Sequence, residues 1–257
     1  MLNYMKSEFY RVIHSSVTYC TTGILAALVF IMNFALYWFR THSEDFPYGT
    51  TSYSFSTFVS SPMVYCYMVF IIAAILYESN KRNGNLKNTI AYGISRTKIF
   101  AGKCIVSLVT SLAMLVVVMT VQISSAVLLL EQTGPVKLSD LLMEIPAVSL
   151  IAVGALILSI VVLEYFDKSI VAMIVWFLIM VGVPAVLLQI GMKVDAVLNV
   201  ALWMPENIFR TGVIANMSQC VTLWDTAQGM GRCLISGAAG ILVFSIAGVL
   251  LLRKKEL

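Results

Sequence analysis

Charged residues are scarce in this sequence, and this scarcity sets its class. Lys, Arg, Asp and Glu make up 12% of the 257 residues, whereas hydrophobic residues make up 60%. A soluble globular domain has about a quarter charged residues and nearer half apolar ones, so this balance indicates a protein dissolved in lipid. The net charge of +4 is too small to indicate nucleic-acid binding, and we expect no nucleic-acid partner.

Histidine and cysteine are also few, and the motifs of common enzyme classes are missing. The two His and five Cys show no CxxC or Cys/His spacing that would hold a metal ion. Neither HExxH nor GxSxG occurs. The string Ala101-Gly102-Lys103-Cys104 resembles part of a P-loop but lacks the upstream Gly and the Ser or Thr after Lys. We therefore predict no catalytic residue, no metal and no cofactor in this chain, and we leave open a disulfide between Cys220 and Cys233.

Long apolar runs are what the chain has instead. A helix needs roughly 20 apolar residues to cross the hydrocarbon core of a bilayer. Six runs qualify: Val17–Trp38, Phe58–Tyr77, Cys104–Leu130, Ile145–Leu163, Ser169–Ile190 and Leu234–Leu252. In lipid every backbone polar group must be satisfied within its own segment, so we predict helices. The fold class is all-α and polytopic, with residues 1–257 as a single transmembrane domain.

The basic residues predict the orientation of these spans. If both termini face the cytoplasm, twelve of the 17 Lys and Arg residues lie on the inner side. The other five, Arg40, Lys137, Lys193, Arg210 and Arg232, lie on the outer side. This asymmetry satisfies the positive-inside rule. We therefore predict a multi-pass protein of a bacterial cell membrane with both termini in the cytoplasm.

Two segments outside the spans carry their own patterns. Residues 1–15 have apolar residues at helical spacing between charged ones, which predicts a helix lying in the membrane interface. Residues 191–232 mix aromatic and apolar residues with charges, and a structureless loop of that length is uncommon. We predict short helices that dip back into the outer interface. Ser61-Pro62 and Glu144-Ile145-Pro146 are expected helix starts, and Pro184 is expected to kink the fifth span.

The interiors of the predicted spans contain only neutral polar groups. Asn33, Gln122 and Gln189 are the largest of them, and Glu78, Glu131 and Glu164 fall at span ends. Proton and sodium carriers keep ionisable residues at membrane depth. The sequence therefore disfavours an ion-coupled secondary carrier.

The longest polar stretch, Glu78–Lys103, carries six Lys or Arg residues against one Glu. Within it Asn85–Tyr92 predicts a short helix ended by Gly93. Its apolar side would present Leu86, Ile90 and Tyr92, and its polar side Lys87 and Asn88. Such a helix suits a groove on a soluble partner. The alternative is a basic loop that contacts anionic lipid headgroups.

The same stretch resembles the first cytoplasmic loop of ABC-2 type transporter permeases. The resemblance rests on Glu78, Gly84-Asn85-Leu86-Lys87, Gly93-Ile94-Ser95-Arg96 and Lys103. The interfacial N-terminal helix, the six spans, the outer segment before the sixth span and the basic C-terminus are also similar to that family. Asn80-Lys81-Arg82-Asn83 departs from it, because a more acidic run is common there.

This resemblance implies partners and a coupling site. Two permease chains would pair, with a second copy of this chain favoured over a different one, and each would bind a separate ATP-binding subunit. ATP and Mg would lie on that subunit. The residues implied to contact it are Glu78, Leu86, Lys87, Asn88, Ile90, Tyr92 and Arg96. The inner loop Glu164–Lys168 would add a smaller contact.

The resemblance also implies a substrate path along the second and fifth spans. There the sequence offers the soft or aromatic side chains Met63, Tyr67, Met68, Met173, Trp176 and Met180. Such side chains suit an apolar or amphipathic ligand, although they could equally pack helices or face lipid. Permeases of this size resemble exporters of phenol-soluble-modulin-type peptides and lantibiotic or bacitracin immunity permeases. We expect an amphipathic peptide as cargo; the alternatives are a lipid, a drug or sodium, or a non-transporting anchor or sensor subunit.

Overall fold

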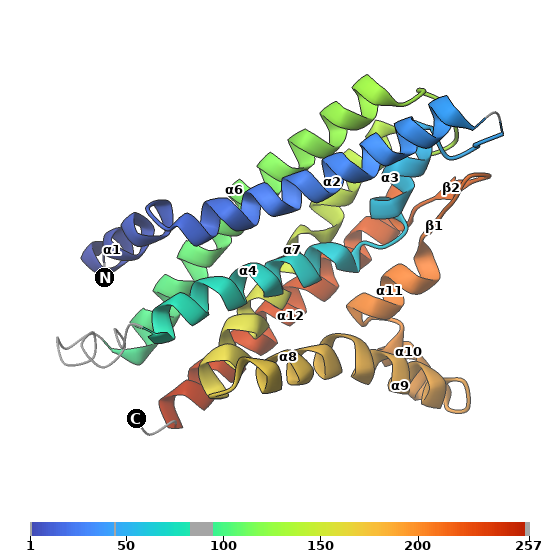
Figure 1. The fold of residues 1–257 in the computed structure, drawn as a ribbon. Coiled ribbons are helices and arrows are strands. Elements are labelled where there is room, and N and C mark those ends of the chain that lie inside the picture. The colour runs from blue at the N-terminus through green and yellow to red at the C-terminus, as the bar shows by residue number, and fades with distance from the viewer. Residues whose placement is uncertain (1, 44, 83–94, 255–257) are drawn as a thin grey trace.

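The chain folds into long, roughly aligned helices in the computed structural model, which describes residues 2–43, 45–82 and 95–254 (Figure 1). The long helices are α2 (Ser16–His42), α4 (Met63–Arg82), α6 (Arg96–Leu129), α7 (Leu138–Tyr165) and α12 (Ala227–Lys254). A further apolar run consists of α8 (Ser169–Phe177), a π-helical turn η1 (Leu178–Gly182) and α9 (Val183–Gly191). Among the described residues, five helical runs are long and apolar enough to cross a membrane, and a bent pair makes a sixth. The predicted all-α polytopic class is confirmed.

The bent pair forms the second span. The short helix α3 (Thr51–Val59) and the first part of α4 meet at 69°. Thr50 caps α3, because its hydroxyl accepts a hydrogen bond from the backbone N–H of Tyr53 at 3.3 Å. Since α4 begins directly after Pro62, the predicted helix start at Ser61-Pro62 agrees with the structure. The first residues of the predicted span Phe58–Tyr77 belong to α3 instead of α4.

The predicted helix start at Glu144-Ile145-Pro146 is wrong. Helix α7 begins at Leu138, where the Asp140 carboxylate accepts a hydrogen bond of 2.8 Å from the backbone N–H of Lys137. Pro146 therefore lies inside the helix, which continues despite the missing N–H. As a result Glu144 belongs to the helix interior. The helices α6 and α12 also begin earlier than the apolar runs that predicted them.

Pro184 does not break the fifth span, which remains one candidate span from Ser169 to Gly191. The local change is the π-helical turn η1, directly before α9. The Asn207 amide donates to the Pro184 carbonyl at 2.8 Å, so a residue of the outer segment contacts the backbone here.

The bundle has two chemically distinct ends (Figure 1). The α1 end holds helix α1 (Leu2–Ile13), which matches the helix predicted in residues 1–15, together with the last turns of α4 and α12. The opposite end, here called the hairpin end, holds α3, α10 (Asp195–Ala201), α11 (Pro205–Gly212), strands β1 (Ile214–Ala215) and β2 (Cys220–Val221), and the 3-10 turn η2 (Leu223–Asp225).

Residues 191–232, which are predicted to lie on the outer side and are here called the outer segment, contain more structure than the predicted short helices. Helices α10 and α11 agree with the prediction, but the antiparallel hairpin of β1 and β2 was not predicted. It pairs Ile214 with Val221 and Ala215 with Cys220. Cys220 and Cys233 are both free thiols, so the possible disulfide between them is not formed.

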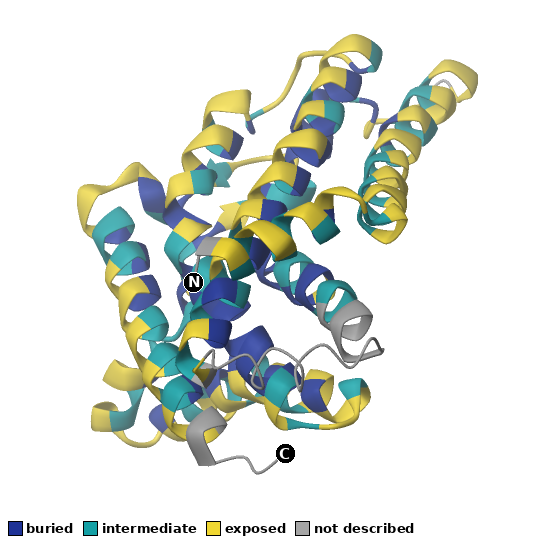
Figure 2. Ribbon diagram, turned by 90° about the vertical axis from the view of Figure 1, so that its left-hand side faces the viewer, coloured by how far each residue is buried: buried dark blue, intermediate teal, exposed yellow. Residues whose placement is uncertain are grey.

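Helix α7 occupies the centre of the bundle and packs along α4 and α12. In its most apolar window 67% of the residues are buried, against 11% for α2 and 17% for α12. Exposed residues cover the outward faces of the helices and buried ones line the inward faces (Figure 2). Because the outward faces of α2 and α12 are largely apolar, they suit contact with lipid or with another subunit.

Candidate functional site

The predicted ATPase-coupling residues lie at the α1 end or outside the described part of the chain. Glu78 falls in the backbone of α4 and Arg96 is the first residue of α6, but their side chains are not among those that the structure describes. Leu86, Lys87, Asn88, Ile90 and Tyr92 lie outside the described residues. The coupling helix therefore stays a prediction.

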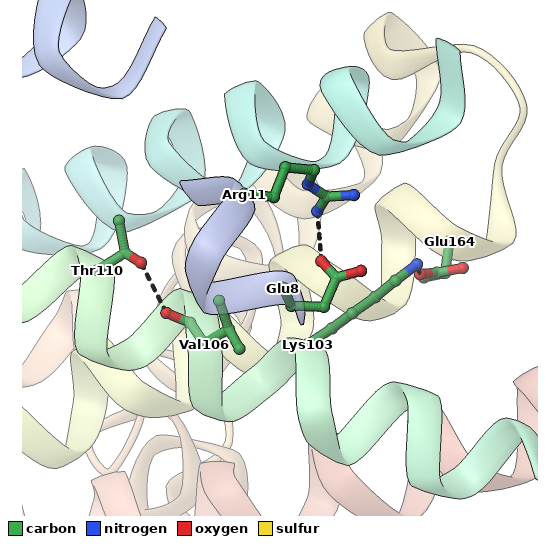
Figure 3. Close-up of polar contacts among 6 residues, drawn as sticks. All are labelled: Glu8, Arg11, Lys103, Val106, Thr110 and Glu164. Carbon is green, nitrogen blue, oxygen red and sulfur yellow. Dashed lines mark hydrogen bonds and ion pairs between the residues drawn. The ribbon is translucent and has the colours of Figure 1, made fainter. Parts of the chain in front are cut away.

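A buried ion pair joins α6 to α7 next to these positions. The Lys103 ammonium contacts the Glu164 carboxylate, and the two side chains are only 11% and 10% exposed (Figure 3). Lys103 lies about two turns inside α6, which begins at Arg96. Because both charged groups are nearly buried, this contact ties α6 to α7.

Helix α1 packs against α6 beside the ion pair. Glu8 and Arg11 form an ion pair within α1, and Figure 3 shows them next to Lys103. The Tyr4 ring lies over Gly102, with its Cε1 atom 2.8 Å from the place that a Cβ would occupy on this glycine. Burial raises the pKa of the Tyr4 hydroxyl, and the carboxylates of Glu8 and Glu164 raise it further. The N-terminal helix is therefore part of one polar cluster at the α1 end.

The predicted substrate-path residues divide into a packed group and exposed ones. Tyr67 and Trp176 meet edge to face with ring centroids 5.9 Å apart, and the Trp176 indole donates to the Ala155 carbonyl at 3.2 Å. Met63, Trp176 and Met180 are buried, whereas Met173 is 50% exposed on α8. Within one chain, then, Trp176 packs α8 against α4 and α7, and Met173 faces outward. Their role in transport stays a prediction.

Met68 lines an apolar cavity of about 330 Å³ between α2, α4, α6 and α7. Phe58 of α3 and Ile145 of α7 border it together with the side chains Leu28, Leu112 and Met119. The polar side chains in its wall are Tyr65, Ser111 and Ser149. A volume of this size is at the lower end of the range of about 300–1,000 Å³ for small-molecule sites.

Sequence reasoning missed a carboxyl group at span depth. The statement that the span interiors contain only neutral groups is wrong, because Glu144 lies inside the apolar helix α7 and is 0% exposed. The Tyr65 hydroxyl donates to Glu144 Oε2 at 3.4 Å, and Glu144 Oε1 has no partner among the described residues. Pro146, two residues later, predicted a helix start, so Glu144 was placed outside the helix. The Lys137–Asp140 cap before an apolar run indicates the earlier helix start that the structure shows.

A second polar cluster joins α2, α3 and α6 in the hairpin-end half of the bundle. The Asn33 amide donates to Ser125 Oγ at 2.7 Å, and the Ser54 hydroxyl donates to Asn33 Oδ1 at 2.6 Å. Gln122 Nε2 donates to Ser54 Oγ at 2.8 Å. Asn33, Ser54 and Gln122 are all 0% exposed. Each of these amides therefore has a partner away from lipid, and the bent second span is tied to its neighbours.

Arg232 organises the outer segment. Its guanidinium donates to the Leu202 carbonyl and lies 5.6 Å from the ring centre of Trp203. Ser236 donates to the Trp203 carbonyl at 2.9 Å. These contacts attach the turn after α10 to the first part of α12, and a surface cavity of about 700 Å³ opens beside them.

The architecture defines a polytopic α-helical membrane protein with a buried polar cluster at each end and an apolar cavity between its helices. Among the described residues no group of His, Cys, Asp and Glu could hold a metal ion. The family model for ABC-2 family transporter proteins matches residues 4–183, which is well over half of the chain. The chain belongs to this family. No curated protein matches the sequence.

Membership confirms the resemblance seen in the loop between the second and third spans. A protein of this family is a membrane-embedded permease subunit of an ABC transporter and associates with an ABC ATPase subunit. The matched residues include the predicted coupling stretch and the first four spans.

Proposed function

We propose that this chain exports a hydrophobic or amphipathic cargo, with an amphipathic antimicrobial-type peptide as the best match. The observation that carries the proposal is the surface of the fifth span. From Ser169 to Gly191 the run contains no Asp, Glu, Lys or Arg. Its exposed side chains are large and apolar, including Met173, Phe177 and Leu178. A path bordered by such a surface favours apolar groups over ions or sugars.

The cycle follows from the division of labour between the subunits. Residues 85–92 would occupy a groove of the ATPase, with Leu86 and Ile90 as apolar contacts and Glu78 and Arg96 beside them. Two copies of this chain would form the transport unit in a bacterial cell membrane, with both termini in the cytoplasm. Closure of the ATPase pair on ATP would move the two permeases relative to each other. The polar cluster around Lys103 and Glu164 would transmit that motion from α6 to α7.

The test is to purify the tagged chain in mild detergent and to identify the soluble protein that accompanies it. We expect a P-loop ATPase whose hydrolysis rate rises when an amphipathic peptide is added. If the ATPase did not respond to peptide but responded to lipid, drug or sodium, the cargo would be that substance and not a peptide. Absence of any ATPase would contradict the proposed coupling.

A pair of variants tests the coupling helix directly. Leu86→Asp with Ile90→Asp should release the ATPase, because charge replaces the apolar contacts. The matched control is Ile214→Asp with Val221→Asp in the hairpin, where both side chains are about half exposed. The control should keep the ATPase. Equal retention by both double variants would overturn the coupling assignment.

A further inference from the structure

The apolar cavity and the carboxyl group of Glu144 lie on neighbouring turns of the same helix. Ile145, Val148 and Ser149 of α7 line the cavity directly after Glu144. Tyr65 belongs to the cavity wall, and its hydroxyl is the donor to Glu144 Oε2 at 3.4 Å. The Tyr65 side chain therefore separates the cavity from the carboxyl group.

Glu144 has no cationic partner within the described chain. The ion pairs of Glu8 with Arg11, Arg40 with Glu131, and Lys103 with Glu164 do not include it. A carboxyl at membrane depth is costly, and such groups generally mark a substrate or ion pathway. Among the described residues, Glu144 Oε1 has no hydrogen-bond partner. An apolar residue at this position would avoid the cost of burying an unpaired oxygen. A cationic group from outside the chain would supply the missing partner.

The lining of the cavity indicates the chemistry of the rest of that partner. Its wall is apolar except for three hydroxyl-bearing residues, and Ser149 already donates to the Pro146 carbonyl at 2.9 Å. Ser111 Oγ is buried and has no partner in the part of the chain that the structure describes. The lining of the cavity includes Phe58 of α3 and Ile145 in the first part of α7, and it continues to Ile72 of α4 and Leu108 of α6. Such a space suits one apolar chain lying along the helices, with its head group at the Glu144 end.

We propose that this cavity binds a single apolar chain that ends in an ammonium group, with Glu144 as the counter-ion of that group. The ammonium reaches the carboxyl by displacing the Tyr65 hydroxyl from Oε2. This inference rests on the proposed function, because it treats the cargo as amphipathic. It adds that the cargo is a cationic amphiphile. It also places binding within one permease chain.

The experiment measures binding to the permease alone, so it does not depend on the ATPase or on a peptide. The purified chain in nanodiscs of zwitterionic lipid is exposed to a dodecylammonium probe with a photoreactive group on its alkyl chain. The comparison probe has the same chain and a neutral alcohol head group. Labelled residues are located by mass spectrometry. We expect roughly tenfold or more preferential labelling of Leu28, Met68 and Leu112 by the ammonium probe, the size of a charge-assisted hydrogen bond.

Three variants separate the counter-ion from the shape of the cavity. Glu144→Gln should lower the preference between the two probes to about one, while the neutral probe still labels the cavity. Glu131→Gln removes an exposed carboxylate that does not line the cavity and should keep the wild-type preference. Tyr65→Phe removes the competing hydroxyl and should keep or increase the preference, so it tests the proposal even if Glu144→Gln fails to fold.

Equal labelling by both probes in the wild-type chain would overturn the inference, as would a folded Glu144→Gln variant that keeps the preference. Loss of the preference in Tyr65→Phe would also contradict it, because Glu144 is unchanged there. None of these results bears on whether an ATPase accompanies the chain, so failure of this inference and failure of the proposed function are distinguishable.

Discussion

Ser54 of the short helix α3 donates a hydrogen bond of 2.6 Å to Asn33 Oδ1 on α2, and both side chains are 0% exposed. This contact attaches the bent second span to the first one in a region surrounded by apolar residues. Gln122 and Ser125 of α6 complete the cluster. The bend between α3 and α4 is therefore held by side-chain hydrogen bonds as well as by packing.

Asn33→Ala should lower the free energy of unfolding by roughly 1–3 kcal/mol, because the buried Ser54 hydroxyl loses its acceptor. Thermal unfolding of the purified protein in detergent measures the change. The control is Ser124→Ala, whose exposed hydroxyl donates to carbonyls of its own helix, Thr120 at 2.7 Å and Val121 at 3.3 Å. If both variants unfolded at the wild-type temperature, the cluster would have no structural role.

Lys103→Met should lower the free energy of unfolding by about 3–5 kcal/mol, because it removes one partner of a nearly buried ion pair. Replacing both residues by Met should cost less than the sum of the single replacements, and a double-mutant cycle measures this coupling. The control pair is Arg40 and Glu131, whose side chains are 33% and 55% exposed. Screening by solvent should reduce their coupling to about 0–1 kcal/mol. Equal coupling in the two pairs would contradict the role assigned to the α1-end cluster.

Cys220 should react slowly with maleimide near neutral pH. Burial, the Asp140 carboxylate 3.5 Å from the sulfur, and Asp225 together raise the pKa of this thiol to about 11. The reference value is 9.0, so at pH 8 the thiolate fraction is roughly 100-fold below that of an ordinary thiol. The measurement is the labelling rate against pH in a variant that keeps only Cys220.

The direction of this pH dependence follows from proton linkage. The folded chain holds the Cys220 proton more tightly than the unfolded chain, so its contribution to stability is present below pH 9 and is lost as the pH rises toward 11. Asp140→Asn should raise the labelling rate at pH 8, and the remote Glu131→Gln should not. A wild-type rate equal to that of an ordinary thiol would show that the hairpin leaves Cys220 open. Labelling by an impermeant maleimide in intact cells would also place the hairpin end outside.

Gly237→Ala should destabilise the contact between α7 and α12, whereas Gly240→Ala should not. A Cβ on Gly237 would lie 2.6 Å from Leu150 Cβ and 2.7 Å from the backbone nitrogen of Ile151. On Gly240 the nearest atom would be Phe244 Cε2 at 3.7 Å, an ordinary contact. Overpacking of this kind typically costs about 1–3 kcal/mol. Thermal unfolding compares the two variants, and equal melting temperatures would refute the close approach of the helices at Gly237.

Small residues such as Ser236 and Gly240 make close helix contact possible in the sixth span. In the structure the close approach to α7 is at Gly237, and Ser236 donates a hydrogen bond to the Trp203 carbonyl. A run of small residues shows that a helix can approach a neighbour, but the rotation of the helix decides which of them makes the contact. That rotation depends on α7 and on the outer segment, which the local pattern does not describe.

Apolar length and the scarcity of charge determined the helical class, because a bilayer leaves the backbone few alternatives. The basic stretch after the second span also carried enough pattern to indicate the family before any fold was known. The partners of the buried polar groups required the tertiary structure, since Asn33 and Gln122 are 89 residues apart and Lys103 and Glu164 are 61 residues apart. Only the packing of α3, α4 and α7 decided that Glu144 lies beside a cavity within the membrane span. Local hydropathy cannot show which neighbour covers a given side chain, and that neighbour determines whether a carboxyl group ends a span or lies within it.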